Sequence, residues 1–343
     1  MADGELPTRS HDELVRELRA RLAAHPFMLA PMAGVTDATY RSIAREHGCP
    51  LAYTEMVSVA GLAFDSERTW ELVEPAPDED QVAVQLFGAK PEQFEPAAAQ
   101  VCERLGERLA LIDINMACPV PKVFKKGEGC ALMGTPEVAS AIVEAAVHGA
   151  DGRVPVTVKI RAGIRSDEVV APEFARRMEA SGACGVAVHG RSAGQLYRGH
   201  ADWRVIDEVA RGVEVPVIGS GDVFEPTDAV ALLQTTGCSG VFVARGSYGN
   251  PWFWARAEEL LRTGVLPPEP TIQMRLDALR LHVTRFAERG CHMARLRPMV
   301  GWYVKGLPAA SVWRARSMAC EGLEDYLELI DDMEAACREH GML

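Results

Sequence analysis

Residues 217–246 read VIGSGDVFEPTDAVALLQTTGCSGVFVARG, and this stretch decides the fold class. Two short apolar runs, residues 217–219 and 241–244, stand near its ends, and a helical pattern lies between them. A turn of small residues and glycine follows each run. A strand, a helix and a second strand in this order form the repeating unit of parallel α/β sheets.

The same alternation extends outward over most of the chain. Apolar, often β-branched runs predict eight strands, and amphipathic stretches such as residues 92–104 and 137–148 predict helices between them. Eight such alternations indicate a parallel sheet covered on both faces, and eight strands close a (β/α)8 TIM barrel. An open doubly wound sheet is the alternative, but its usual G-x-G-x-x-G after the first strand is missing. The predicted strands are residues 28–33, 51–56, 82–86, 112–115, 156–160, 186–189, 217–219 and 241–244.

The strand pattern stops after Trp254. Residues 266–270, Leu-Pro-Pro-Glu-Pro, read as a linker, and residues 271–343 have only helical patterns. We therefore predict a barrel domain over residues 1–265 and a small all-helical C-terminal domain over residues 271–343. The stretch beyond Ser10 predicts an amphipathic helix ahead of the barrel.

Composition favours a soluble globular protein, with 48% hydrophobic and 24% charged residues. The longest candidate membrane segment is short and interrupted by Pro31, and the acidic N-terminus does not resemble a secretory signal. The nine cysteines form no CxxC pair, which argues against a zinc site or a disulfide framework. We expect a cytoplasmic protein without metal. The sequence does not fix the oligomeric state, and a monomer is our expectation.

The net charge of −12 argues against a surface that binds nucleic acid everywhere, but the distribution of charge is uneven. No Asp or Glu occurs between residues 289 and 320. This interval could be a solvated helix face with its counter-charges elsewhere in the fold, or a basic surface for a polyanion. Its cations are Arg289, Arg295, Arg297, Lys305, Arg314 and Arg316.

Polar side chains stand at successive predicted strand ends. Catalytic residues of barrels come from these carboxyl ends and the loops after them, so the side chains should converge on one pocket. A purely structural barrel has no need for Gln, Asn, Lys and His at these positions. The residues are Pro31, Met32, Ala33, Glu55, Gln85, Asn115, Cys118, Lys159, Arg161, His189, Arg191, Ser220, Gly221, Asp222, Ala244, Arg245 and Gly246.

Glycine and small residues follow the last two predicted strands, at residues 219–222 and 244–246. Singly, each glycine is more often part of a turn. Together, in the loops that commonly bind phosphate in barrels, they predict an anion site to which Arg245 adds a positive fork.

Two charged or titratable residues at strand ends have competing explanations. Lys159 either forms a salt bridge with a barrel carboxylate such as Asp113 or Glu55, or stabilises charge on a bound ligand such as a reduced flavin. A lone His189 is more often a satisfied core histidine, but its place at a strand end favours a role in the pocket.

These residues match a known family: the chain resembles the tRNA-dihydrouridine synthases, and looks most similar to their bacterial B type. The resemblance runs from Met28 to the C-terminal helices, and the Asn-x-x-Cys-Pro segment is its most specific part. The matching segments are APMAGVTD at 30–37, QLFG at 85–88, DINMACP at 113–119, KIR at 159–161, HGR at 189–191, QLYRG at 195–199, GSGD at 219–222, RG at 245–246 and WY at 302–303.

The resemblance implies an FMN enzyme that reduces uridines of tRNA with NADPH as electron donor. Cys118 would be the catalytic acid, and Asn115 with Arg191 would contact the uracil. The helical domain would bind tRNA, with an affinity that falls steeply with salt and is weakened by substitution of Arg314 or Arg316. FMN would be held by Pro31, Met32, Ala33, Gln85, Lys159, His189, Ser220, Gly221, Asp222, Ala244 and Arg245.

The chain departs from the family pattern at three positions. Ser220 stands where Asn is common, and Ala244 and Ala117 stand where Gly is common. All three residues are small, so the departures affect single contacts and the shape of one loop.

Reduction of the uracil C5–C6 bond needs a hydride at C6, which the flavin would supply, and a proton at C5. A thiol has an ordinary pKa near ~8.5 and is mostly protonated at neutral pH, so Cys118 can donate that proton. The competing explanation is a buried, inert cysteine. Its place beside Pro119, in a loop rich in lysine and glycine, argues against that.

Two other functions remain open from the sequence. One is an FMN barrel enzyme for a small molecule, such as a relative of dihydroorotate or dihydropyrimidine dehydrogenase, which has no use for a basic helical domain. The other is a non-catalytic RNA-binding protein that keeps the barrel as a scaffold. The sequence does not say which uridine is modified, and NADPH rests on the resemblance alone.

Overall fold

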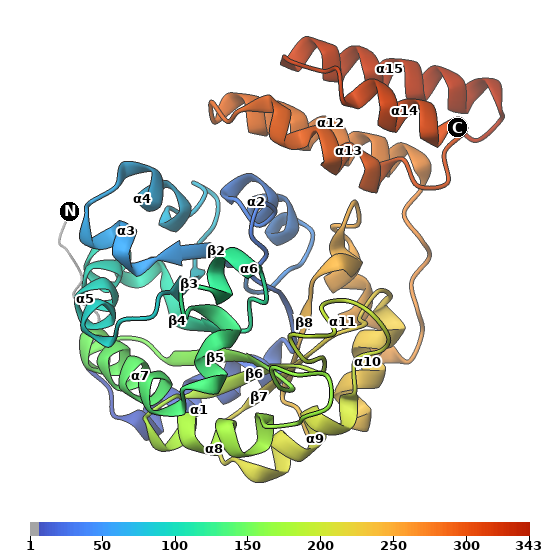
Figure 1. The fold of residues 1–343 in the computed structure, drawn as a ribbon. Coiled ribbons are helices and arrows are strands. Elements are labelled where there is room, and N and C mark those ends of the chain that lie inside the picture. Colours follow the sequence, from blue (N-terminus) through green and yellow to red (C-terminus); the bar gives the residue numbers. More distant parts are fainter. Residues whose placement is uncertain (1–6) are drawn as a thin grey trace.

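The computed structural model describes residues 7–343, and its centre is a barrel of eight parallel strands (Figure 1). Neighbouring strands pair in the order β1-β8-β7-β6-β5-β4-β3-β2. The Leu29–Ala52 bridge joins β1 to the start of β2 and closes the ring. The predicted (β/α)8 barrel is therefore confirmed. The strands are β1 Phe27–Leu29, β2 Tyr53–Ser58, β3 Val82–Phe87, β4 Leu109–Met116, β5 Val156–Arg161, β6 Gly185–His189, β7 Val217–Ser220 and β8 Gly240–Val243.

The helices of the barrel surround the strands, and their apolar faces pack on the outside of the sheet (Figure 1). Short 3-10 turns at Pro91–Gln93, Gly106–Arg108, Gly129–Gly134 and Arg245–Ser247 complete the connections. The helices are α1 His11–Ala24, α2 Ala38–Glu46, α3 Val59–Ala63, α4 Glu67–Val73, α5 Phe94–Leu105, α6 Pro121–Phe124, α7 Pro136–Ala150, α8 Ala171–Ala180, α9 Trp203–Gly212, α10 Pro226–Thr235 and α11 Phe253–Thr263.

The first predicted strand was too long. Residues 28–33 were expected to be extended, but β1 ends at Leu29, and the residues after it turn over the end of the barrel. Val35 and Thr36 each donate a backbone hydrogen bond to the Met32 carbonyl, which makes a tight turn there. This early exit brings residues 30–33 to the carboxyl end of the barrel.

Helix α1 closes the amino end of the barrel. Ser10 and Glu13 form a capping box at its start, and Leu14, Leu18 and Leu22 bury one face against the barrel interior. Two strands begin with glycine where these leucines approach. A Cβ at Gly185 would lie 2.8 Å from Leu18 Cδ2, and one at Gly240 would lie 2.8 Å from Leu22 Cδ2. The barrel interior is therefore packed at this end.

The C-terminal helices lie beside the barrel next to α2 and form their own hydrophobic cluster (Figure 1). No regular element occurs in residues 265–271, and the expected helical C-terminal region follows them. The division into domains at these residues stays a prediction. The helices are α12 Ile272–Glu288, α13 Arg297–Tyr303, α14 Ala310–Ser317 and α15 Leu323–Glu339, with a 3-10 turn at Met293–Leu296.

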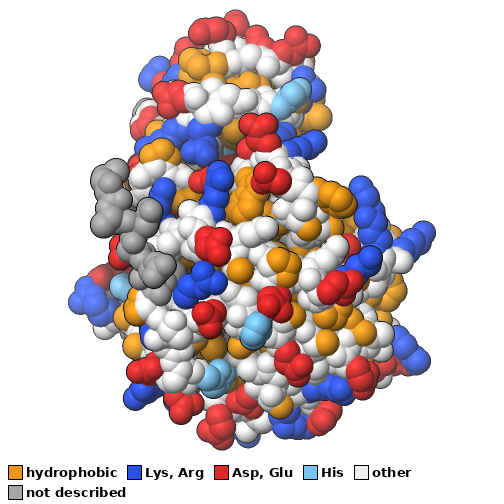
Figure 2. Space-filling view, turned by 90° about the vertical axis from the view of Figure 1, so that its left-hand side faces the viewer, with side chains coloured by type: hydrophobic (Ala, Val, Ile, Leu, Met, Phe, Trp, Pro, Cys, Tyr) orange, Lys and Arg blue, Asp and Glu red, His pale blue; other side chains and the backbone are white. Residues whose placement is uncertain are grey.

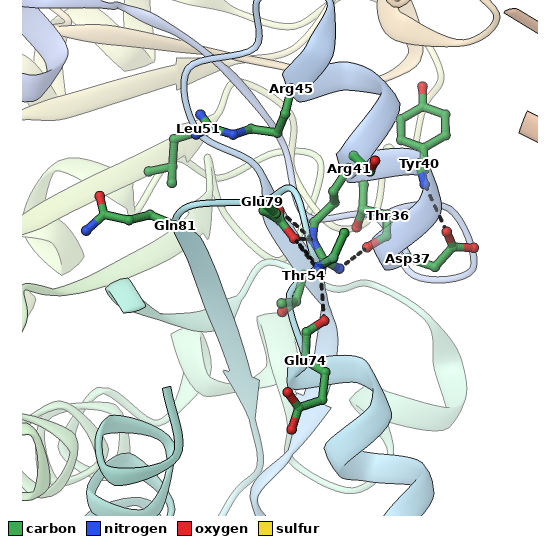
Figure 3. Close-up of polar contacts among 12 residues, drawn as sticks. Thr36, Asp37, Tyr40, Arg41, Arg45, Leu51, Thr54, Glu74, Glu79 and Gln81 are labelled. Carbon is green, nitrogen blue, oxygen red and sulfur yellow. Dashed lines mark hydrogen bonds and ion pairs between the residues drawn. The ribbon is translucent and has the colours of Figure 1, made fainter. Parts of the chain in front are cut away.

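A buried ion pair fixes the segment that leads from β1 into α2 (Figure 3). Arg41 Nε lies 3.0 Å from Glu79 Oε1, and the two side chains are only 1% and 0% exposed. The same guanidinium donates to the carbonyls of Thr36, at 2.9 Å, and Glu74, at 3.0 Å. Asp37 caps α2 by accepting from the Tyr40 backbone N–H. The Arg41 side chain and the Asp37 cap thus fix the end of the turn at residues 30–37.

Residues 7–343 contain neither a candidate membrane-spanning helix nor a candidate metal cluster. None of the helices there combines the length and the apolar character needed to cross a bilayer. Within the same residues, no three His, Cys, Asp or Glu side chains come together in a way that could hold a metal ion.

Candidate active site

A cavity of about 400 Å³ opens at the carboxyl end of the barrel. Its size lies in the range of small-molecule and cofactor sites. Residues from many strand ends meet in its wall, as the sequence predicted. The lining residues are Ala30, Pro31, Met32, Ala33, Met56, Asn115, Ala117, Cys118, Pro119, Val120, Lys159, Arg161, His189, Tyr197, Ser220, Gly221, Asp222, Val223, Phe224, Phe242, Ala244, Arg245 and Tyr248.

A chain of buried hydrogen bonds lies beneath the cavity. Asn115 Nδ2 donates to Gln85 Oε1 at 2.8 Å, and Gln85 Nε2 donates to Asp113 Oδ2 at 2.6 Å. Thr157 Oγ1 donates to the other oxygen of Asp113. Burial raises the pKa of Asp113 to about 6. Gln85 therefore lies below the cavity wall and orients Asn115, which does line the cavity.

Asn115 also positions Cys118. The Asn115 side-chain oxygen accepts from the backbone N–H of Cys118 at 3.0 Å, so the residue after β4 turns back toward the strand. Arg161 Nε donates to the Ala117 carbonyl at 2.7 Å and holds the same turn from the next strand. Gly129, with φ +62°, lies so close that a Cβ there would be 2.7 Å from the Cys118 carbonyl oxygen. The thiol is thus set on a tightly supported loop.

Lys159 and His189 are polar residues of the cavity lining. Burial, reinforced by the nearby Arg161, lowers the pKa of Lys159 to about 8, although Asp113 acts in the opposite direction. Burial and the charge of Lys159 hold the pKa of His189 well below its usual value, so the imidazole is neutral. Among residues 7–343, no carboxylate lies within ion-pair distance of the Lys159 ammonium. The salt-bridge explanation for Lys159 is therefore not favoured.

The loops after β7 and β8 form one side of the cavity. Gly221 has φ +116°, and a Cβ there would lie 2.7 Å from His189 Cδ2, so only glycine fits. No group within the described part of the chain accepts from the backbone N–H of Gly221, Arg245 or Gly246. The Arg245 guanidinium lies between two aromatic rings, 5.0 Å from Tyr197 and 4.9 Å from Phe224. Free N–H groups beside a fixed guanidinium suit a phosphate.

Arg191 and Asp222 form an ion pair with each other. Arg191 Nη2 donates to both Asp222 oxygens, at 2.6 and 2.7 Å, and also to the Gly199 carbonyl. Arg191 is buried and is absent from the cavity lining, whereas Asp222 reaches it and also lies 3.8 Å from Arg245. Asp222 therefore links the buried Arg191 to the Arg245 side chain electrostatically. The predicted contact of Arg191 with a substrate stays a prediction.

Several aromatic residues that line the cavity were not among the predicted site residues. Tyr197 follows β6 by eight residues, and Phe224 and Tyr248 come from the loops after β7 and β8. The Gln-x-Tyr-x-Gly segment gave a signal for Tyr197, but no pattern in the sequence distinguishes Phe224 or Tyr248 from ordinary loop residues.

The C-terminal helices border the cavity. The ring of Trp302 stacks on Tyr248 with centroids 4.1 Å apart. Arg295 Nη2 lies 3.0 Å from Glu55 Oε1 and 3.6 Å from Asp37 Oδ2, which ties the helices to the turn at residues 30–37. A ligand in the cavity would therefore lie beside both parts of the chain.

The basic interval contains both paired and unpaired cations. Arg316 lies 2.6 Å from Asp332, whereas Arg289, Lys305 and Arg314 are exposed and have no ion-pair partner among residues 7–343. Figure 2 shows Lys and Arg side chains where the C-terminal helices meet the barrel, below an outer surface that carries Asp and Glu. Part of the interval is therefore open to an anionic partner.

Comparison with known proteins gave consistent results. The family model described as dihydrouridine synthase matches residues 28–339. A probable tRNA-dihydrouridine synthase of Treponema pallidum is 37% identical over 88% of this chain and 91% of its own. A tRNA-dihydrouridine synthase B of Xanthomonas campestris is 34% identical over 89% of this chain and 91% of its own.

Among solved structures, histamine dehydrogenase from Rhizobium sp. 4-9 shares the fold. The TM-score is 0.52 at 13% sequence identity, and the match covers 76% of this chain and 48% of that enzyme. The present chain therefore spans about half the length of that structure.

Proposed function

Since this chain belongs to the dihydrouridine synthase family, we propose that it reduces specific uridines of tRNA to 5,6-dihydrouridine, with FMN as cofactor and NADPH as electron donor. The observation that carries the proposal is one cavity lined both by Cys118 and by the loops after β7 and β8, where the backbone N–H groups of Gly221 and Arg245 have no acceptor among residues 7–343.

The residues of the cavity fit FMN. The phosphate would accept from the backbone N–H groups of Gly221 and Arg245 and from the Arg245 guanidinium. Pro31, Met32 and Ala33 would pack against the ring, and Lys159 and His189 would contact its polar edge. Ser220, Asp222 and Ala244 complete the phosphate loops, and Gln85 acts through Asn115. Bound there, the flavin would supply a hydride to C6 of the uracil.

Cys118 would donate the proton to C5 of the uracil. The thiol lines the cavity, and Asn115 fixes its backbone. Asn115 would contact the uracil by exchanging its weak donation to Met56 Sδ, at 3.2 Å, for a hydrogen bond to the base. A uridine in a loop of tRNA leaves its stack more easily than one in a duplex, so it can enter the cavity.

FMN affinity should fall as the pH rises through about 8. The pKa of Lys159 is lowered to about 8, so its ammonium loses a proton there and attracts the electron-rich polar edge of the flavin ring less strongly. We expect a dissociation constant that rises from about pH 7 to about pH 9.5, measured by titrating apoprotein with FMN. The Lys159→Met variant should bind FMN more weakly at pH 7 and show a flat profile. A wild-type profile as flat as that of the variant would exclude this role for Lys159.

Arg314 should contribute more to tRNA affinity than Arg316. Arg314 is exposed and unpaired within the described residues, whereas Arg316 is engaged by Asp332. We expect Arg314→Gln to lower the slope of log affinity against log salt by about 0.7–0.9, the value for one phosphate contact. Arg316→Gln should change the slope by much less. Equal effects of the two substitutions would contradict this assignment.

An absorption spectrum of the purified protein tests the proposed function. A flavin spectrum that NADPH bleaches, and that recovers without oxygen only when unmodified tRNA is added, is the expected result. Recovery with free pyrimidines would favour a small-molecule enzyme instead. A protein that does not take up FMN at all would contradict the proposal.

A further inference from the structure

The lysines of this chain are few and unevenly placed. Arginine supplies 30 of the 36 Lys and Arg residues, and the other six are lysines. Four of the lysines follow the adjacent strands β3 and β4 at the carboxyl end of the barrel, a fifth lies near the end of β5, and the sixth lies between α13 and α14. They are Lys90, Lys122, Lys125, Lys126, Lys159 and Lys305.

The lysines also differ from most arginines in their contacts. Within residues 7–343, no lysine forms an ion pair or a side-chain hydrogen bond. Exposed arginines on the flank of the barrel, such as Arg176, Arg211 and Arg262, are each paired with a carboxylate on the same helix. Many arginines of this protein thus form intramolecular ion pairs, whereas the lysines of residues 7–343 have no intramolecular partner and can bind an anionic one.

Four exposed lysines form one continuous edge, called here the lysine edge: Lys90, Lys122, Lys125 and Lys126. Lys90 belongs to the loop after β3, and the other three belong to α6 and the loop after it. The two loops are in contact, because a Cβ at Gly127 would lie 3.8 Å from Ala89 Cβ. Two carboxylates in these loops, Glu92 and Glu128, oppose four lysines, so the edge is locally positive.

The lysine edge begins at the catalytic loop. Cys118 starts the segment that carries three of the lysines, and the Cys130 backbone N–H returns to the Cys118 carbonyl at 3.1 Å. Val120 and Phe124 of this loop are 50% and 38% exposed. Apolar side chains beside unpaired cations suit a nucleic acid, whose bases stack on apolar groups while its phosphates meet the cations.

We propose that the lysine edge is a second tRNA-binding surface, which contacts phosphates of the strand next to the uridine in the cavity. The inference rests on the proposed function and deepens it. The C-terminal helices border the cavity through the turn after β1 and the loop after β8, whereas the lysine edge follows β3 and β4. Contacts from both groups of elements would hold the backbone around a base that has left its stack. Lysine is a flexible point charge and suits a backbone whose path is irregular.

The test is the triple variant Lys122→Gln, Lys125→Gln, Lys126→Gln in the full flavin-loaded chain. We expect its affinity for unmodified tRNA to fall by about 10- to 100-fold at ~0.1 M salt, and the salt slope to decrease by about 2–3. The triple Lys→Arg variant at the same positions should restore most of the affinity. The rate at which NADPH bleaches the flavin without tRNA should be unchanged.

The matched control removes three positive charges elsewhere, with Arg176→Gln, Arg211→Gln and Arg262→Gln on α8, α9 and α11. An equal loss of tRNA affinity in this control would overturn the proposal, because net charge alone would then explain the effect. An increased KM for NADPH with unchanged tRNA affinity would also overturn it, because the edge would then bind the dinucleotide. Wild-type protein that neither binds nor reduces tRNA would instead refute the proposed function itself.

Discussion

Replacement of Cys118 by alanine is expected to lower tRNA uridine reduction by about 10²- to 10⁴-fold while FMN remains bound. The thiol is the acid proposed to protonate C5, and alanine removes the proton without removing a contact to the phosphate loops. The measurement is the dihydrouridine content of tRNA after a single turnover, together with the flavin absorption spectrum of the variant.

Two further variants show whether the loss comes from the missing acid. Cys118→Ser keeps a similar shape but has a much weaker acid, so it should resemble Cys118→Ala. Cys291→Ala changes the other partly exposed cysteine, which is absent from the cavity lining, and should leave the rate unchanged. Near-normal reduction by Cys118→Ala would rule out the assignment.

Replacement of Glu79 by alanine is expected to destabilise the protein by about 3–5 kcal/mol, because it leaves the buried Arg41 guanidinium without its carboxylate. When one partner of a buried pair is removed, the free-energy cost of desolvating the remaining charge is no longer offset by the ion pair. The measurement is the free energy of unfolding in urea at neutral pH, with fluorescence and circular dichroism compared to check that the transition is two-state.

An exposed ion pair provides the control for this prediction. Glu173 pairs with Arg176 on the surface of α8, and Glu173→Ala should cost less than about 1 kcal/mol. The double variant Arg41→Met, Glu79→Leu should recover much of the loss, because neither charge then remains buried. If Glu79→Ala were as stable as Glu173→Ala, the pair would have no special role.

The fold was predictable because its signal is repeated. Each of the eight apolar runs is buried as a strand, and the glycine-rich turns after residues 217–219 and 241–244 stand where the predicted anion site requires them. The error at residues 30–33 has a physical cause. These residues are as apolar as a strand, but they pack over the barrel end and into the cavity wall, and burial alone does not distinguish the two environments.

The candidate site was only partly predictable. Strand ends identify Asn115, Lys159 and His189, because neighbouring parallel strands end at the same edge. The Arg41–Glu79 pair was not predictable, because its partners are far apart in sequence and resemble ordinary surface charges. Arg191 shows the opposite limit. Its position at a strand end suggested a ligand contact, which stays a prediction, whereas nothing in the sequence indicates that its Nη2 atom pairs with Asp222.

The leucines of α1 have a consequence for the order of events in the proposed reaction. Because they fill the amino end of the barrel, the cavity is reached from its carboxyl end, where Trp302 and Arg295 of the C-terminal region border it. The nicotinamide donor and the tRNA loop would then reach the flavin through the same opening of the cavity. The two would have to bind one after the other. The flavin would therefore hold two electrons after the oxidised donor leaves and before the tRNA binds.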